Sequence, residues 1–217
     1  MRRGILLAVT ALCLMSMLLA AGCAPQQRTA AVPRPEGKLA VAGFTNPIYN
    51  WQLLAGYLDE EGRPAPDGAV QALDQILLDT LAEHQVFDYI LPTAVHQCEE
   101  VVVFEQSGVP KKSAFKYWLG VGKCIQADLL LVPQVTHWRE RVGSDSGVQS
   151  PASVAMEFYL IDVQNERITR TRFEETQVSL LENFFTARKF ADRGGKWVTA
   201  TRLASDGIKE KLMELGL

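Results

Sequence analysis

The stretches DLLLVPQV, residues 128–135, and SVAMEFYLIDVQNERI, residues 153–168, decide the fold. The first is apolar on both faces, which is typical of a strand in the centre of a sheet, and Pro133 within it predicts a bulge or an exposed stretch. In the second, every other residue from 154 to 160 is apolar, which predicts a strand with one face in the core. The chain is therefore expected to contain two long core strands.

A tight turn and another strand follow this pair. Gln164-Asn165 predicts the turn, because Asn tolerates the positive φ that such turns require. The run from Ile168 to Phe173 then predicts a strand that returns along its neighbour. The C-terminal part of the sheet is thus expected to be built from hairpins.

Further strands are predicted in the N-terminal half of the chain. Residues 38–44, 86–91 and 101–104 are short apolar runs, and the first two are bounded by turn signals. Helices are predicted between and after these runs.

The clearest helix has Leu73, Leu77 and Leu81 on one face. Two more are predicted by apolar residues at helical spacing, one ending near Ile125 and one ending near Leu215. The expected N-caps of the three helices are Asp67, Ser113 and Thr199. This order predicts an α/β sandwich: a mixed sheet of about five strands, a C-terminal hairpin portion, and helices packed on the sheet.

Residues 1–22 have the layout of a secretion signal. Arg2 and Arg3 precede an apolar run from Ile5 to Ala21, which at roughly 17 residues is short for a bilayer core that needs about 20. We therefore expect a signal peptide and not a membrane-spanning anchor.

The junction LAAGC, residues 19–23, resembles the lipobox of bacterial lipoproteins, with Ala20 where that family usually has Leu. The resemblance implies that Cys23 carries acyl chains such as palmitate and anchors the chain in a membrane. Ala24 follows where Asp would favour the inner membrane, so the resemblance implies the periplasmic face of the outer membrane. The alternative is an ordinary cleavage site with a chance cysteine.

The expected organisation of the secreted chain is simple. Residues 23–37 are polar and Pro-containing, which predicts a lipidated N-terminus and a flexible tether, and residues 38–217 are enough for one periplasmic domain. Without its first 22 residues the chain keeps 20 of 22 basic and all 25 acidic residues, so its net charge is −5. A mildly acidic chain is a poor match for nucleic acid, which we do not expect as a partner.

Cys98 and Cys124 are the cysteines that remain beside Cys23 after such processing. In an oxidising compartment they could form a disulfide, but the sequence does not supply the geometry that a disulfide requires. Two separate thiols are the alternative.

A resemblance to a known group covers residues 38–175 approximately. Its motifs, in chain order, are KLAVAGF, LLDTLAEH, VFDYILP, ADLLLVPQV and SVAMEFYLIDVQNERI. This order resembles the periplasmic α/β domain shared by the curli-secretion lipoprotein, the lipoprotein activator of penicillin-binding proteins and the N-terminal domain of TolB. Ala127-Asp128 and Asp162-Val163 match pairs that recur in the group, whereas Glu166 stands where Gly is usual.

The resemblance implies a non-catalytic module, because members of that group scaffold envelope machines. The stretch FEETQVSLLENFF, with RGGKWVT after it, resembles a set of uncharacterised bacterial lipoproteins and implies no function of its own.

Motifs for catalysis or metal binding are not recognised in the sequence. His84, His96 and His137 have no Cys or His at metal-ligand spacing, and residues 120–124 lack a Gly and the Ser or Thr of a phosphate loop. Residues 59–61 are acidic but lack the alternating ligands of a calcium loop. No catalytic residue, metal or cofactor is therefore expected.

Two places are candidates for a partner surface. His137, Arg139 and Arg141 share one face of a strand that outruns its apolar stretch, which indicates either a solvated hairpin arm or a surface that meets a partner or a polysaccharide. The loop with Tyr49 and Trp51 is the second candidate. Residues 194–197 could form an anion-binding nest, although a plain turn is the simpler interpretation.

These observations favour a lipid-anchored module that binds another envelope protein as an activator or assembly factor. The alternative is a ligand-binding or enzymatic domain whose site is assembled from scattered residues. The oligomeric state is left open.

The first testable prediction concerns Cys23, at which the apolar run and the small-residue junction converge. Replacing Cys23 by Ser should abolish the incorporation of a radioactive fatty acid in cells, because the acyl chains are carried by this thiol. Equal labelling of the variant and the wild type would contradict the lipoprotein interpretation.

Overall fold

The computed structural model describes residues 32–56, 58, 62–105, 113–178 and 189–217. The expected signal peptide, the expected lipidation site Cys23 and the acidic residues 59–61 lie outside the described residues. In the part that is described, no helix is long and apolar enough to span a membrane.

A mixed five-stranded sheet forms the centre of the fold and confirms the predicted α/β class. The order of its strands is β2 (Tyr89–Ile90), β1 (Leu39–Val41), β3 (Leu129–Arg139), β6 (Ser153–Asp162) and β7 (Arg167–Thr176). The first three strands are parallel to one another, and β3, β6 and β7 are antiparallel neighbours. A separate two-stranded sheet pairs β4 (Val142–Gly143) with β5 (Val148–Ser150).

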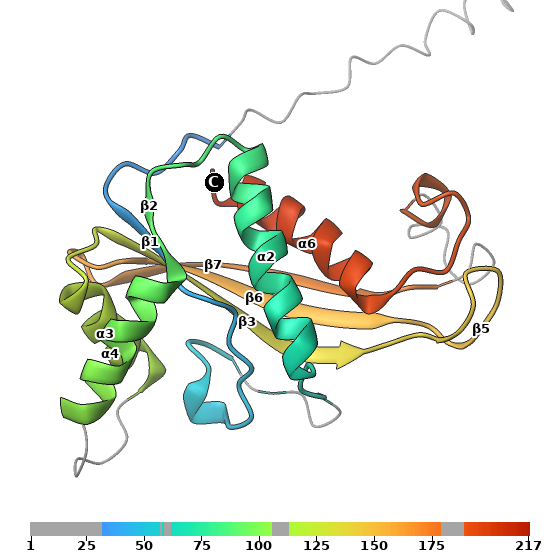
Figure 1. The fold of residues 1–217 in the computed structure, drawn as a ribbon, viewed down its shortest axis with the longest axis horizontal. Coiled ribbons are helices and arrows are strands. Elements are labelled where there is room, and N and C mark those ends of the chain that lie inside the picture. The colour runs from blue at the N-terminus through green and yellow to red at the C-terminus, as the bar shows by residue number, and fades with distance from the viewer. Residues whose placement is uncertain (1–31, 57, 59–61, 106–112, 179–188) are drawn as a thin grey trace, which may run out of the picture. The chain divides into compact units, whose positions relative to one another are not determined.

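Helices cover the two faces of the sheet unequally (Figure 1). One face packs against α2 (Asp67–Glu83) and α6 (Ala200–Glu214), and we call the apolar cluster between them and the sheet the first core. The other face packs against α3 (Pro92–Glu105) and α4 (Ala114–Cys124), which lie at the end of the sheet near β1 and β2. The apolar cluster between these helices and the sheet is the second core. A short 3-10 helix, η1 (Asn50–Gln52), lies in the loop between β1 and α2.

The predicted phase of the early helix is confirmed. Leu73, Leu77 and Leu81 are fully buried between α2 and the sheet, whereas Gln71 and Gln75 are exposed. Because these leucines recur every four residues, they form one apolar stripe along the helix. α6 packs next to α2 on the same face of the sheet and completes the first core, and its apolar face was also predicted.

A strand predicted over residues 101–104 is wrong, because these residues belong to α3. Val95, Cys98 and Val102 recur at helical spacing and pack on the second core, while Val101 and Val103 are exposed. The period of burial thus overrides the strand preference of a run of valines. The strand predicted over residues 86–91 is confined to Tyr89–Ile90.

Two of the three predicted N-caps are confirmed. The side chains of Ser113 and Thr199 accept hydrogen bonds from the backbone N–H groups of Lys116 (3.5 Å) and Arg202 (3.2 Å). Asp67 is not a cap, because Pro66 precedes the helix and Asp67 is its first residue. An acidic residue in the first turn still suits the helix dipole.

The bulge in β3 lies at Thr136 and not at Pro133. The register with β6 shifts between Val135 and His137, and Pro133 is buried and paired in register with Phe158. Pro133 lies beyond Leu131, the last residue of β3 that pairs with β1, so its missing N–H interrupts no pair of that register.

The turn between β6 and β7 also differs from the expectation. Positive φ is found at Glu166 (53°) and not at Asn165. The Asp162 carboxylate accepts hydrogen bonds from the backbone N–H (2.9 Å) and the side-chain amide (2.8 Å) of Asn165, and the left-handed residue comes one position later than expected. The backbone at position 166 is thus in the region that favours Gly.

The last part of the expected tether is fastened to the domain. Arg34 donates hydrogen bonds to the backbone carbonyls of His84 (3.0 Å) and Gln85 (3.3 Å) at the C-terminal end of α2. These carbonyls have no partner within the helix, so the guanidinium satisfies them. Residues 32–37 therefore follow the surface of the domain.

The burial of α2 generates the second prediction. Leu77→Ala should lower the free energy of unfolding by about 2 to 5 kcal/mol, because it leaves a cavity in a fully buried site. The measurement is a denaturant melt, with Gln71→Ala on the exposed face as the matched control. A loss below about 0.5 kcal/mol for Leu77→Ala would show that this face of the helix is not in the core.

Candidate functional site

A polar groove lies on the face of the sheet that α3 and α4 cover only at one end. It has a volume of about 160 Å³ and crosses β3, β6 and β7. We call it the sheet groove. Its lining residues are Leu53, Ala55, Thr136, His137, Arg139, Ser153, Ala155, Glu157, Arg172, Glu174 and Thr176.

The bulge at Thr136 builds one wall of the sheet groove. Because the register shifts there, His137 and Arg139 face the groove together with their partners Ala155 and Ser153 on β6. The intervening Trp138 points into the first core and is buried. Without the bulge, the two-residue period would turn His137 toward the core.

An ion pair between a buried carboxylate and an exposed arginine forms the floor of the sheet groove. The Glu157 side chain is 3% exposed, and its two oxygens accept hydrogen bonds from Arg170 Nε (2.8 Å) and Arg170 Nη2 (2.7 Å). Arg172 lies 3.6 Å from the same carboxylate and 2.7 Å from Glu174. The hydrogen bond with Glu157 raises the pKa of Arg170 above its usual range, so the guanidinium stays charged.

Arg139 is the cation of the groove that has no carboxylate within 4 Å among the described residues. Its Nε donates to the carbonyl of Pro151 at 3.2 Å, which holds the guanidinium in place. The remaining N–H donors of a guanidinium then suit a planar acceptor such as a carboxylate or a backbone carbonyl.

Tyr49 and Trp51 lie in the loop that borders the sheet groove. Their rings are stacked, with centroids 6.0 Å apart and an interplanar angle of 11°, and the two residues are 55% and 46% exposed. The buried Gln134 of β3 fixes this loop, because its amide donates to the carbonyl of Gln52 (3.1 Å) and accepts from the N–H of Leu54 (3.4 Å). The aromatic pair is therefore held on the sheet, although it is in a loop.

Tyr159, under the same loop, is a structural group. Burial, followed by the charge of Glu157, raises the pKa of Tyr159 to about 12. Its hydroxyl donates to the carbonyl of Ala55 at 3.1 Å, so the proton is retained and used to hold the loop. Acid–base chemistry near neutral pH does not suit such a group.

His137, Arg139 and Arg141, which the sequence predicts on one face of a strand, do not lie on one surface in the structure. His137 and Arg139 line the sheet groove, but Arg141 does not, because β3 ends at Arg139 and the Arg141 guanidinium donates to the carbonyl of Trp197. Glu140 has a structural role that the sequence did not indicate: its carboxylate accepts from the N–H of Ala200 at 3.1 Å, at the start of α6.

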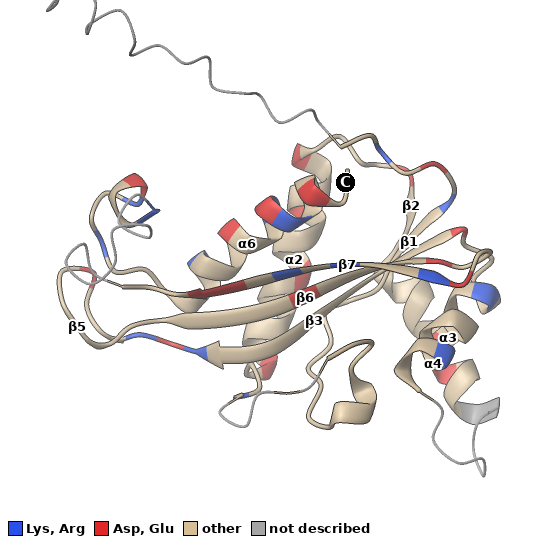
Figure 2. Ribbon diagram, turned by 180° about the vertical axis from the view of Figure 1, so that it is seen from behind, with Lys and Arg blue, Asp and Glu red and all other residues tan. Residues whose placement is uncertain are grey.

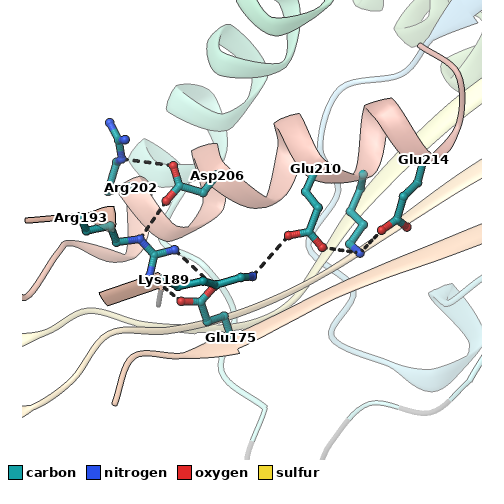
Figure 3. A network of polar contacts seen from close by, with 8 residues as sticks. Glu175, Lys189, Arg193, Arg202, Asp206, Glu210 and Glu214 are labelled. Atoms are coloured by element: carbon teal, nitrogen blue, oxygen red, sulfur yellow. Dashed lines mark hydrogen bonds and ion pairs between the residues drawn. The ribbon is translucent and has the colours of Figure 1, made fainter. Parts of the chain in front are cut away.

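A network of ion pairs ties residues 189–193 to β7 and α6 (Figure 3). Arg193 and Lys189 contact the Glu175 carboxylate at 2.5 Å and 3.2 Å, and Arg193 also contacts Asp206 at 2.9 Å. The side chains of Glu175 and Arg193 are each 8% exposed. The network continues along α6 through Glu210, Lys211 and Glu214.

The other motifs considered in the sequence have structural roles. Residues 120–124 lie at the end of α4, and a disulfide joins Cys98 to Cys124 with an S–S distance of 2.08 Å. The N–H groups of Gly194 and Gly195 donate to Ala191 and Phe190, so they end a helical turn and do not form a nest. Over the described ranges no group of three His, Cys, Asp or Glu residues could hold a metal ion.

Glu157 and its two arginines are not among the site residues predicted from the sequence. One signal was present: Glu157 is the single charged residue between Ser153 and Ile161, in an otherwise apolar strand. A carboxylate inside such a strand requires a cation on the neighbouring strand, and Arg170 and Arg172 alternate on the next one.

Comparison with known proteins gives only distant likenesses. No family model and no curated protein matches the chain. The PelC dodecamer from Paraburkholderia phytofirmans is 18% identical with a TM-score of 0.45, over 86% of this chain and 91% of that one. The lipoprotein GNA1162 from Neisseria meningitidis is 15% identical with a TM-score of 0.38, over 73% and 93%.

The C-terminal domain of LpoB from Escherichia coli is 14% identical with a TM-score of 0.35, over 70% of this chain and 91% of that one. All these TM-scores lie below 0.5, so we draw no argument from them. The function must be argued from the residues of this chain.

The ion-pair network generates the third prediction. Burial alone would raise the pKa of Glu175, but Arg193 and Lys189 outweigh it and hold this pKa below its usual value. A lowered pKa in the folded state stabilises the protein above the pKa of the unfolded chain, and this stabilisation is lost as the pH falls through the folded-state pKa. Glu175→Gln should therefore cost about 1 to 3 kcal/mol at pH 7 and progressively less below pH about 4.

The measurement is the free energy of unfolding as a function of pH, with the exposed Glu174→Gln as the matched control. Equal stability of Glu175→Gln and the wild type at pH 7 would show that the network does not support the fold.

Proposed function

We propose that this protein is a lipid-anchored, non-catalytic module that binds another envelope protein through the sheet groove and the Tyr49–Trp51 pair. In this proposal Cys23 carries the lipid and holds the domain at the periplasmic face of the outer membrane. The observation that carries the proposal is the exposed aromatic pair, which is stacked and fixed on a loop beside a groove with an available arginine.

The aromatic pair supports contact with a protein. Tyr, Trp and Arg are the side chains that most often dominate the binding energy of protein interfaces. Tyr and Trp bury much area at a small entropic cost, because each has only two side-chain torsions. Tyr49 and Trp51 already restrain each other by stacking, so less freedom is lost when a partner covers them. Ile48, which is 57% exposed, adds apolar area next to the pair.

The shape of the sheet groove supports the same kind of partner. Its volume of about 160 Å³ is below the roughly 300 to 1,000 Å³ of typical small-molecule pockets. It is also lined by strands, so it presents a firm and shallow polar surface. Such a surface suits a protruding segment of a protein, with Arg139, the last residue of β3, as a donor at one end of the groove.

The alternative, a ligand-binding or enzymatic domain, is favoured by one different observation. A second pocket of about 370 Å³ lies between residues 34–39, the turn at residues 85–88 and Leu217. This size is within the small-molecule range. It shares no lining residue with the sheet groove, so one experiment can separate the two functions.

The fourth prediction is tested by site-specific photocrosslinking in cells, followed by mass spectrometry. A crosslinker in place of Trp51 should capture one discrete envelope protein, whereas the same crosslinker in place of Met213, an exposed residue of α6, should not. Capture should fall about tenfold or more in an Arg139→Ala background, because arginine is among the residues that most often dominate the binding energy of an interface.

The melting temperature of Arg139→Ala should stay close to that of the wild type, since this residue is only half-buried. Equal capture from positions 51 and 213, or capture that Arg139→Ala leaves unchanged, would contradict the proposed surface. A small molecule that protects the wild type and not a variant of the second pocket, such as Phe87→Ala, would favour the alternative.

A further inference from the structure

The outer edge of β7 is a long strand edge without a partner in the described part of the fold. β7 is the last strand of the sheet, its ten residues pair with β6 without a register shift, and the described residues give its outward backbone groups no hydrogen bond. Figure 2 shows β7 along the border of the sheet, with its charged residues in blue and red. An edge of this length is a template for another strand.

The charges on β7 are arranged with a polarity. Its basic residues, Arg167, Arg170 and Arg172, come first, and its acidic residues, Glu174 and Glu175, come last. β7 has no proline and no bulge, the devices that most often block an exposed edge. In the described part of the fold, the charges of β7 are therefore what prevents its edge from pairing with strands of unrelated proteins.

We infer that β7 pairs with β7 of a second copy, antiparallel and about a two-fold axis at Phe173. In this register Arg172 lies opposite Glu174 of the second copy, and Glu174 lies opposite Arg172. These side chains point to the sheet-groove face and are 43% and 61% exposed, so they can reach across the new pair. The two five-stranded sheets become one continuous sheet with an isologous interface.

The charges select this register over its neighbours. Side-chain period allows shifts of two residues only, and a shift in one direction places Arg172 opposite Arg172 of the second copy. The opposite shift places Glu174 opposite Glu174. Like charges directly opposite each other destabilise a strand pair, and of these three registers only the one centred on Phe173 places no like charges opposite each other.

The energetics predict a weak dimer. The outward face of this pairing adds backbone hydrogen bonds and charge pairs but little apolar area, since Phe173 is already buried under α6. Small, polar interfaces are typical of transient association. Self-association is therefore expected to depend strongly on protein concentration and on salt.

The test is sedimentation velocity of the purified full chain in detergent micelles. The bound detergent contributes equally to the sedimentation of all variants, so differences between variants report on self-association. The wild type should form a concentration-dependent dimer. Arg172→Glu and Glu174→Arg should each raise the apparent Kd about tenfold or more, because two symmetry-related pairs become repulsive. A mixture of these two variants should dimerise again, since each now complements the other.

Circular dichroism and melting temperature establish that each variant is folded. Arg172→Glu also brings a carboxylate near the buried Glu157, so if it unfolds, Glu174→Arg alone decides the question. A wild type that stays monomeric, a Glu174→Arg variant that dimerises as the wild type does, or two folded variants that fail to dimerise when mixed would each overturn the inference.

Discussion

Burial of β3 on both faces is the constraint on which the rest of the structure depends. At its N-terminal half, Leu129 and Leu131 face the first core, and Leu130 and Val132 face the second. The strand can be buried on two sides only where helices cover both, and α3 and α4 cover one side near β1 and β2 alone. Beyond Val135 one face of the sheet therefore has to be polar, and the sheet groove is the result.

The polar face is made possible by charge pairing across strands. Glu157 would be costly to bury next to an apolar core, but Arg170 on β7 engages both of its oxygens. Gln134 on β3 and Tyr159 on β6 use the same face to hold the loop that carries Tyr49 and Trp51. The candidate surface is thus built on rigid strands, and its exposed aromatic pair is the end of a buried hydrogen-bond network.

Much of the fold could be predicted from the sequence, because the long elements have a strong period. The alternation from Val154 to Leu160 and the leucines of α2 each predict one arrangement, and the structure has it. The strand prediction for residues 101–104 was wrong because a run of valines has the local preference of a strand. These residues form part of a helix, and the burial of Val102 on one side of it depends on contacts with distant residues.

The candidate site was harder to predict than the fold. Arg139 and Arg141 have the same parity in the sequence, yet the end of β3 separates them, and only a contact with Trp197 shows where Arg141 points. The bulge at Thr136 has no local signal comparable to the Pro133 that suggested one. Glu157 was visible as a lone charge in an apolar strand, but its partner depends on the pairing register of β6 with β7.

The loop that carries Tyr49 and Trp51 is a preorganised surface because β3 fixes it. Native-state amide hydrogen exchange tests this preorganisation most directly, because the N–H of Leu54 donates to the buried side chain of Gln134 while the N–H groups around Ser146 lie in an exposed hairpin. The account predicts that the Leu54 amide exchanges about a hundredfold or more slowly than those of the exposed hairpin, and that Gln134→Ala removes this protection. Exchange of Leu54 at the rate of the hairpin in the wild type would contradict it.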